Sequence, residues 1–212
     1  MSNYSTIRLR DNNIIDFCTG NGIVPLILSR RTSKKVEGIE IQKKLYDLAI
    51  KTIDYNKLSD RISLYNCDVK DFVKKIDCLY DLVLCNPPYF KNNIKSDKNI
   101  SVEKRIARHE MLINLDEICY CASKILKDNG TFSMVHRVDR FMDVISCFKN
   151  HSIEPKRIKF IFDNINSESN LFLIEGQKNA NSGLKIDKPL VLRNLDGSFT
   201  EEYKLLQEEI II

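Results

Sequence analysis

The chain has 212 residues, a mass of 24.6 kDa and a net charge of +4. Its 43% apolar and 29% charged residues are typical of a globular protein and exclude disordered, collagen-like and coiled-coil classes. No apolar run approaches the roughly 18 residues of a membrane span, and the first residues lack the apolar core of a signal peptide. We therefore expect one domain over residues 1–212, located in the cytoplasm and acting as a monomer.

The first two thirds of the chain alternate between strand and helix patterns. Short apolar or β-rich runs predict strands at residues 14–17, 36–39, 61–65, 80–85 and 131–136. Apolar residues at helical spacing predict helices at residues 23–31, 42–56, 114–128 and 141–149. Asn114 and Glu117 have the spacing of a capping box, and Asn129-Gly130 is typical of a left-handed helix end.

Beyond residue 150 the pattern changes. Strand-like runs at 158–162, 171–174 and 189–192 have no long helix between them, which predicts an antiparallel hairpin at the end of the sheet. From about residue 194 the tail is acidic, with five acids against one lysine. The alternation before it predicts an α/β fold with a mostly parallel sheet covered on both faces. Ligands of such sheets bind beyond the carboxyl ends of the strands.

The seven cysteines are scattered and form no C-x-x-C pair. This pattern is typical of reduced core thiols and does not match a disulfide or zinc framework. His109 and Glu110 do not form a metal motif, and His151 is interpreted as an ordinary surface residue. We therefore expect no metal ion.

A glycine turn ends the first predicted strand in the sequence DFCTGNG, residues 16–22. Its glycines let the backbone approach a ligand closely, although a glycine turn alone is a weak signal. Glu40 ends the second strand, where a carboxylate can accept two ribose hydroxyls, and Asp68 follows the third, where it can accept the amine of an adenine. The simpler interpretations are a solvated acid and a helix N-cap. Together the three features favour an adenosine-containing cofactor, and Pro25 at the place of a third glycine disfavours a nicotinamide dinucleotide.

The most specific motif is Asn86-Pro87-Pro88-Tyr89, which ends the fourth strand. The prolines fix φ and donate no hydrogen bond, so the corner presents the Asn86 side-chain oxygen and the Pro87 carbonyl as acceptors. Two acceptors that hold the hydrogens of a planar amine favour a pyramidal nitrogen, with its lone pair directed at an electrophilic methyl group. Tyr89 can stack on the planar group. The simpler interpretation is a strand-to-loop turn with a surface tyrosine.

A family resemblance rests on the order of these motifs. The D-x-x-x-G-x-G turn with Glu40 and Asp68 resembles the class I S-adenosylmethionine-dependent methyltransferases. The series DFCTGNG, GIE, NCD and CNPPYF, followed by Ala107-Arg108-His109-Glu110 and Val135-His136-Arg137, resembles the bacterial tRNA(Val) adenine-N6 methyltransferases over about residues 12–195. The resemblance implies a Rossmann-like fold with a mostly parallel seven-stranded sheet and a C-terminal antiparallel hairpin.

The resemblance also implies roles for individual residues. S-adenosylmethionine would be held by Asp16, Gly20, Asn21, Gly22, Glu40, Ile41, Asp68, Val69 and Asn86. Asn86, Pro87 and Tyr89 would hold the target base. Candidates for contacts with RNA are Lys91, Arg108, His109, His136 and Arg137, for which local salt bridges and a satisfied histidine are the simpler interpretations. The basic body of the chain is compatible with such a partner.

The predicted function is methylation of the N6 atom of an adenine in a tRNA anticodon loop. One alternative is a protein-glutamine N5-methyltransferase, because the same NPPY motif serves amide substrates. A second is a non-catalytic RNA-binding module with a degenerate cofactor site. Cys18, where the family usually has glycine, and the short segment before the first strand favour this second alternative.

Overall fold

The computed structural model describes residues 1–88 and 114–211. Its strands are β1 (Ile14–Phe17), β2 (Val36–Ile39), β3 (Ile62–Tyr65), β4 (Tyr80–Cys85), β5 (Leu126–Arg137), β6 (Ile153–Phe162), β7 (Ser169–Lys178), β8 (Lys185–Ile186) and β9 (Leu190–Val191). Its α-helices are α1 (Ile23–Arg31), α2 (Lys43–Tyr55), α3 (Val69–Lys75), α5 (Leu115–Ile125), α6 (Phe141–Asn150) and α7 (Glu201–Ile211).

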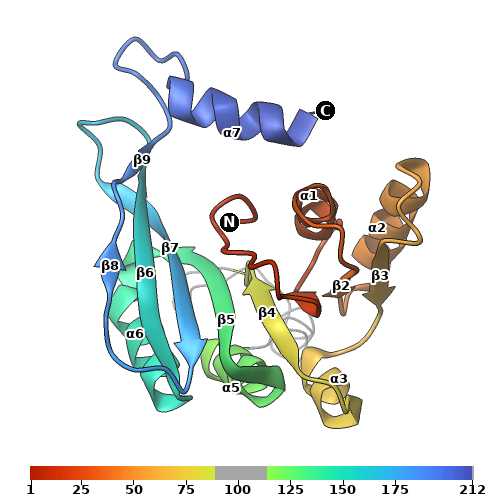
Figure 1. The fold of residues 1–212 in the computed structure, drawn as a ribbon. Coiled ribbons are helices and arrows are strands. Elements are labelled where there is room, and N and C mark those ends of the chain that lie inside the picture. Colours follow the sequence, from red (N-terminus) through yellow and green to blue (C-terminus); the bar gives the residue numbers. More distant parts are fainter. Residues whose placement is uncertain (89–113, 212) are drawn as a thin grey trace, which may run out of the picture.

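These strands form one sheet in the order β3-β2-β1-β4-β5-β7-β6-β8, with β9 paired to β6 (Figure 1). The pairs from β3 to β5 are parallel, and β7 runs antiparallel to both β5 and β6. The predicted mostly parallel α/β sheet with an antiparallel hairpin is therefore confirmed. Seven strands carry the sheet, and the two-residue strands β8 and β9 extend it at the edge.

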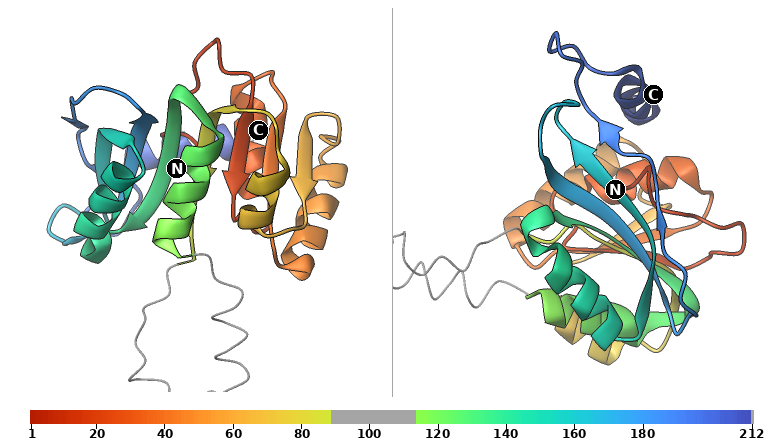
Figure 2. Two further views of the ribbon diagram at one scale, coloured as in Figure 1. Left: turned by 90° about the horizontal axis from the view of Figure 1, so that it is seen from below. Right: turned by 90° about the vertical axis from the view of Figure 1, so that its left-hand side faces the viewer.

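Helices cover the sheet on both faces, with α1 and α2 on one side and α3, α5 and α6 on the other (Figures 1 and 2). Apolar side chains reach both layers of helices because successive residues of a strand point to opposite faces of the sheet. Ile15 and Phe17 join the larger core cluster with α3, α5 and α6, whereas Ile14 packs with Val24 and Leu28 of α1.

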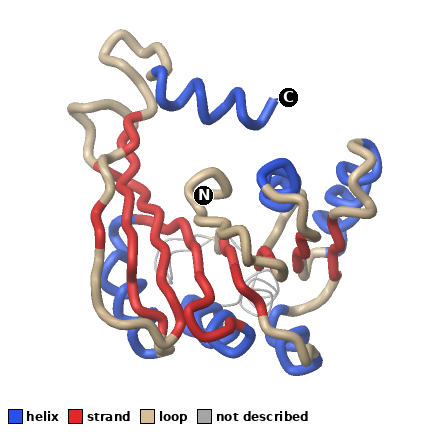
Figure 3. The backbone as a smooth tube through the Cα atoms, viewed as in Figure 1, coloured by secondary structure: helices blue, strands red, loops and turns tan. Residues whose placement is uncertain are grey.

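Residues before β1 cover the α1 face of the sheet beside β5 and β7. The Ser5 hydroxyl is 2.7 Å from that of Ser133, and both side chains are buried. The backbone amide and hydroxyl of Thr6 donate to the two carboxylate oxygens of Glu175, at 2.6 and 2.9 Å. Helix α7 passes over this segment (Figure 3), where the Asn3 amide donates to the carbonyl of Leu206.

Two predictions near the ends of elements are wrong. The capping box of Asn114 and Glu117 is present, but α5 ends at Ile125, and residues 126–130 continue as β5 because Leu126 pairs with Tyr80. Asn129 does have a left-handed φ of 60°, at an irregularity of this strand and not at a helix end. The acidic tail contains the helix α7, which was not expected from the sequence.

The partly buried carboxylate of Glu37 connects three strands of the parallel half. The Tyr65 and Tyr80 hydroxyls each donate to a different oxygen of Glu37, both at 2.6 Å. Burial, and next the bond to Glu37, raise the pKa of Tyr80, so this hydroxyl stays a donor at all ordinary pH values. Because Tyr80 lies on β4 and Glu37 on β2, the contact spans the intervening β1.

We expect Tyr80→Phe to lower the free energy of unfolding by about 1–3 kcal/mol, because it removes a partly buried hydrogen bond to a charged acceptor. Urea denaturation measures the loss. Tyr55→Phe is the matched control, since the Tyr55 side chain is exposed. Equal stability of the two variants would contradict the assigned role of the Glu37 contact.

Candidate active site

The turns that follow β1, β2, β3 and β4 lie side by side at one edge of the sheet. Phe17, the last residue of β1, pairs with Ile39 of β2 and with Cys85 of β4. Ile39 in turn pairs with Tyr65, so the strands end in register. The chain order reverses between β1 and β4, which is the place where open α/β sheets bind their ligands. The predicted site motifs that are described therefore meet at one edge.

The glycine turn has a left-handed backbone at three positions. Cys18, Gly20 and Gly22 have φ values of 56°, 58° and 82°. The Gly22 amide donates to the carbonyl of Thr19 at 3.0 Å, and α1 begins directly after it without a side-chain cap. An uncapped helix N-terminus presents backbone amides and a partial positive charge. The turn can therefore receive a polar or anionic ligand group.

The two glycines of the turn differ in their surroundings. A Cβ atom added at Gly22 would lie 3.1 Å from the Cβ of Ala49 in α2, whereas one added at Gly20 would meet nothing within 4 Å. The turn is thus closely packed on the α2 side and open beside Gly20. This open space lies at the sheet edge where a cofactor is expected.

Asp16 is buried beneath the turn. One carboxylate oxygen accepts a hydrogen bond from the Thr19 hydroxyl at 2.6 Å. The other is buried and has no hydrogen-bond partner among the described residues. Burial raises the pKa of Asp16 to about 8, with the hydrogen bond from Thr19 opposing the shift and the charge of Glu40 adding to it. At neutral pH the group is a neutral acid with an unused polar atom.

Glu40 ties the first two turns together. Its two oxygens accept from the backbone amides of Gly20 and Gln42, each at 2.8 Å. The side chain is buried, so it is not the solvated acid of the simpler interpretation. A carboxylate oxygen can accept more than one hydrogen bond, and the ribose contact stays a prediction. Asn66, which belongs to none of the predicted site motifs, donates to the carbonyl of Glu40 at 2.8 Å and supports this turn.

Asp68 caps α3 by accepting from the Lys70 amide at 2.7 Å. The simpler interpretation of Asp68 is therefore confirmed, and its contact with an adenine remains a prediction. Val69 is buried, while Ile41 is 40% exposed beside Glu40. An exposed apolar side chain at this edge suits the face of a flat ring.

The corner after β4 is presented to solvent. Asn86 and Pro88 are exposed, and Pro87 between them is buried, which anchors the corner to the sheet. The peptide bonds of the described residues are all trans. Because Cys85 pairs with Phe17, the corner adjoins the glycine turn across the β1–β4 boundary.

The remaining predicted site residues are described only in part. Tyr89, Lys91, Arg108 and His109 lie outside the described residues. His136 is buried, and its Nδ1 accepts from the Arg137 amide. Burial lowers the pKa of His136, so the ring is neutral at pH 7 and offers no charge to a phosphate. Arg137 forms an ion pair with Asp139 at 2.8 Å, as the simpler interpretation expected.

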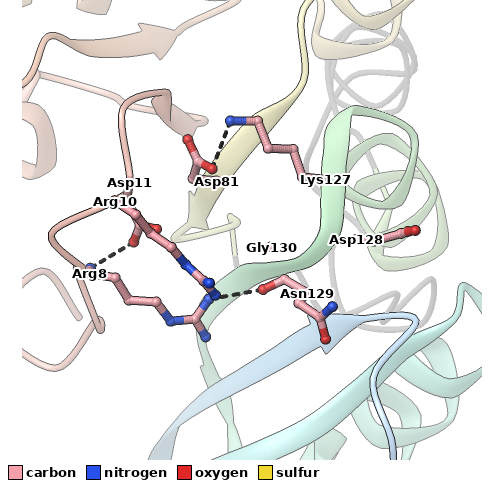
Figure 4. A pocket seen from close by; sticks show the side chains of 8 residues that line it. All are labelled: Arg8, Arg10, Asp11, Asp81, Lys127, Asp128, Asn129 and Gly130. Carbon is pink, nitrogen blue, oxygen red and sulfur yellow. Dashed lines mark hydrogen bonds and ion pairs between the residues drawn. The ribbon is translucent and has the colours of Figure 1, made fainter.

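A shallow cavity of about 230 Å³ lies at the opposite, amino edge of the sheet (Figure 4). Several of its charged groups have partners within the chain. Lys127 pairs with Asp81 at 2.8 Å, and an Arg8 guanidinium nitrogen donates to the carbonyl of Asn129 at 3.0 Å. We interpret this cavity as the junction of the N-terminal segment with β4 and β5, and not as the active site.

Comparison with known proteins identifies the family. A family model described as the methyltransferase small domain matches residues 3–151. The chain belongs to this family.

Relatives of this methyltransferase small domain include two curated proteins named tRNA1(Val) (adenine(37)-N6)-methyltransferase. The one from Flavobacterium psychrophilum is 28% identical over 69% of this chain, which spans 63% of that protein's length. The one from Flavobacterium johnsoniae is 24% identical over 94% of this chain and 84% of its own length.

Solved structures share the fold of the methyltransferase small domain. A crystal structure described as a predicted O-methyltransferase from Agrobacterium tumefaciens has a TM-score of 0.76 and 18% identity, and the alignment covers 97% of this chain and 92% of that one. The predicted Rossmann-like class I methyltransferase fold is thereby confirmed. Within the described residues, no helix is long and apolar enough to cross a membrane.

We expect Gly20→Ala to leave the protein folded, at a cost of about 1 kcal/mol for a side chain at positive φ. Its methyl group enters the open space beside the turn, so calorimetric titration should show binding of S-adenosylhomocysteine weakened by at least about tenfold. Gly22→Ala is the contrasting variant, because its methyl group meets Ala49 and should lower stability further. Unchanged affinity in Gly20→Ala would place the ligand elsewhere.

Asp16 should make stability depend on pH. The folded protein keeps the Asp16 proton up to pH about 8, whereas an ordinary aspartate loses it near 3.8. The unfolded chain therefore binds fewer protons in this window, and the contribution of Asp16 to the free energy of unfolding falls as pH rises. Asp16→Asn cannot ionise, so its stability relative to the wild type should increase from pH about 4 to about 8.

Urea denaturation across this pH range tests the expectation. Asp60→Asn, at an exposed position, should follow the wild type throughout. A stability difference for Asp16→Asn that does not change with pH would contradict the raised pKa.

Proposed function

We propose that the protein transfers a methyl group from S-adenosylmethionine to the N6 atom of an adenine in a tRNA anticodon loop. The observation that carries the proposal is the position of the Asn86-Pro87-Pro88 corner, exposed beside the glycine turn at the β1–β4 boundary. Membership of the methyltransferase small domain family and the names of its tRNA-modifying relatives support it.

The described residues fit the proposed cofactor. The space beside Gly20 is open, and the unpartnered oxygen of Asp16 lies beneath the turn. The residues proposed to hold the cofactor are Asp16, Gly20, Asn21, Gly22, Glu40, Ile41, Asp68, Val69 and Asn86. When bound, S-adenosylmethionine supplies a methyl group on a positively charged sulfur. Glu40 keeps the Gly20 amide in place by its hydrogen bond, which fixes one wall of the site before any ligand arrives.

Asn86 and Pro87 are proposed to activate the amine. The lone pair of an adenine N6 is delocalised into the ring, so the nitrogen is a poor nucleophile. The Asn86 side-chain oxygen and the Pro87 carbonyl can each accept one of its hydrogens, which favours a pyramidal nitrogen whose lone pair is available. Since Pro87 is buried and both prolines fix φ, the backbone of the corner and its Pro87 carbonyl are set in place in advance. Such preorganised positioning needs no strong base.

The RNA contacts are inferred from the sequence. Tyr89 is proposed to stack on the target base, and an unpaired base in a loop is accessible to such stacking. Lys91, Arg108 and His109 are proposed to contact the RNA. Arg137 is exposed enough to exchange its Asp139 partner for a phosphate, because its side chain is 39% accessible.

We expect Asn86→Ala to lose methyl transfer to tRNA by at least about a hundredfold, in line with the loss of one preorganised polar contact to the reacting group. Binding of S-adenosylhomocysteine should weaken by less than about tenfold, which is roughly 1.4 kcal/mol, because Asn86 is only one of the nine residues proposed to hold the cofactor. The assay uses methyl-labelled cofactor and total tRNA, followed by mass spectrometry of the nucleosides for N6-methyladenosine.

The matched control is Asn166→Ala, which truncates an exposed asparagine in the loop between β6 and β7. Full transfer by Asn86→Ala would refute the mechanism. Label appearing in an added release-factor-like protein, and not in tRNA, would favour glutamine methylation instead. No cofactor binding at all would favour the non-catalytic RNA-binding module.

A further inference from the structure

Helices α5 and α6 bring together side chains that ordinarily bind metal ions. Asp116 and Cys119 are three residues apart on α5, and Cys147 and His151 are four residues apart at the end of α6. Each spacing places both side chains on one face of a helix. The two faces meet, because His151 Nε2 lies 2.8 Å from an Asp116 carboxylate oxygen.

The ligand atoms are already close to the arrangement that a metal ion requires. The Cys147 sulfur is 3.8 Å from the same Asp116 oxygen. The ligand atoms of Asp116, Cys147 and His151 all lie within 4.8 Å of one another. Around tetrahedral zinc, neighbouring nitrogen, oxygen and sulfur ligands are about 3.3–3.8 Å apart, as the usual bond lengths require. Small side-chain rotations would therefore close the site.

Cys119 lies beside this cluster without belonging to it. The neighbouring Cys147 thiol, followed by burial, raises the pKa of Cys119, but the Cys119 sulfur is not among the ligand atoms that lie within 4.8 Å of one another. Both sulfurs are buried, and Asp116 is exposed. The cluster therefore has an apolar inner side, which shields the thiols, and an outer side through which an ion can enter.

The cluster also corrects an expectation from the sequence. His151 is not an ordinary surface residue, since its side chain is only 17% accessible. The ring is held between the Asp116 carboxylate and the edge of Tyr120, whose ring centroid is 5.9 Å away. Fixed ring orientation is typical of histidines that bind metal ions.

We propose that Asp116, Cys147 and His151 bind one zinc ion, with a water molecule as the fourth ligand. One thiolate, one imidazole and one carboxylate suit zinc better than calcium or magnesium, which prefer oxygen. The ion would join the start of α5 to the end of α6. On binding, the Cys147 thiol releases its proton to solvent as the metal–sulfur bond forms.

Cobalt titration of the reduced, chelator-treated full chain tests the proposal. We expect one equivalent of Co²⁺ to produce thiolate charge-transfer absorption and the strong visible bands of tetrahedral cobalt, and one equivalent of Zn²⁺ to abolish both. The melting temperature should rise with Zn²⁺ and fall again with a chelator, because the metal binds only the folded state.

Variants distinguish the cluster from incidental binding. Asp116→Ala changes an exposed group and His151→Ala a half-buried one, and each should weaken metal affinity by at least about tenfold. Cys147→Ser should remove thiolate absorption, with circular dichroism checking its fold. The control is Cys78→Ser, at an exposed cysteine outside the cluster. Absence of binding by the wild type, or affinity that survives both the Asp116→Ala and the His151→Ala change, would overturn the proposal and leave an ordinary Asp116–His151 hydrogen bond.

Discussion

Phe17 lies between Ile39 and Cys85 in the parallel sheet, and this register determines where each functional turn begins. Parallel strands that end together place their following loops at one edge. Glu40 then connects the first two loops through hydrogen bonds from the Gly20 and Gln42 amides. The proposed chemistry depends on this alignment, because a glycine turn and a proline corner 64 residues apart in the numbering become neighbours only through the sheet.

Local patterns in the sequence were sufficient to predict the strands of the parallel half of the fold. The runs ending at Phe17, Ile39 and Cys85 are apolar and short, and glycine, acid or proline residues stop each of them. The same patterns gave a wrong prediction at residues 126–130, which were expected to end a helix but pair with β4 in the sheet. The helix α7 has a weak apolar stripe, and its contacts come from distant segments such as the one around Asn3. At residues 126–130 the pairing with β4 overrides the local preference.

The candidate site shows the same division between local and distant information. Glu40 and Asp68 could be identified from the sequence as acids at strand ends. The backbone amides that donate hydrogen bonds to Glu40 could not be predicted from it. His151 was misinterpreted because its partner Asp116 lies 35 positions earlier in the chain. The contribution of basic residues to an RNA-binding surface was overestimated for a related reason, because their acidic partners are also distant in the sequence. Arg157 pairs with Glu175 and Asp187, and Lys159 with Glu202, so counting charges along the chain overstates the cationic surface.

The distribution of thiols has a practical consequence for spectroscopy. All seven cysteines are free, but only Cys78 is exposed; Cys18 and Cys67 are half-buried, and the other four are buried. Burial also raises the pKa of Cys67 and of Cys85, which keeps these sulfurs in the less reactive thiol form. A maleimide dye added in limiting amount should therefore attach first to Cys78. This residue precedes β4 at the amino edge of the sheet, so the natural chain accepts a fluorescent reporter at the end remote from its glycine turn.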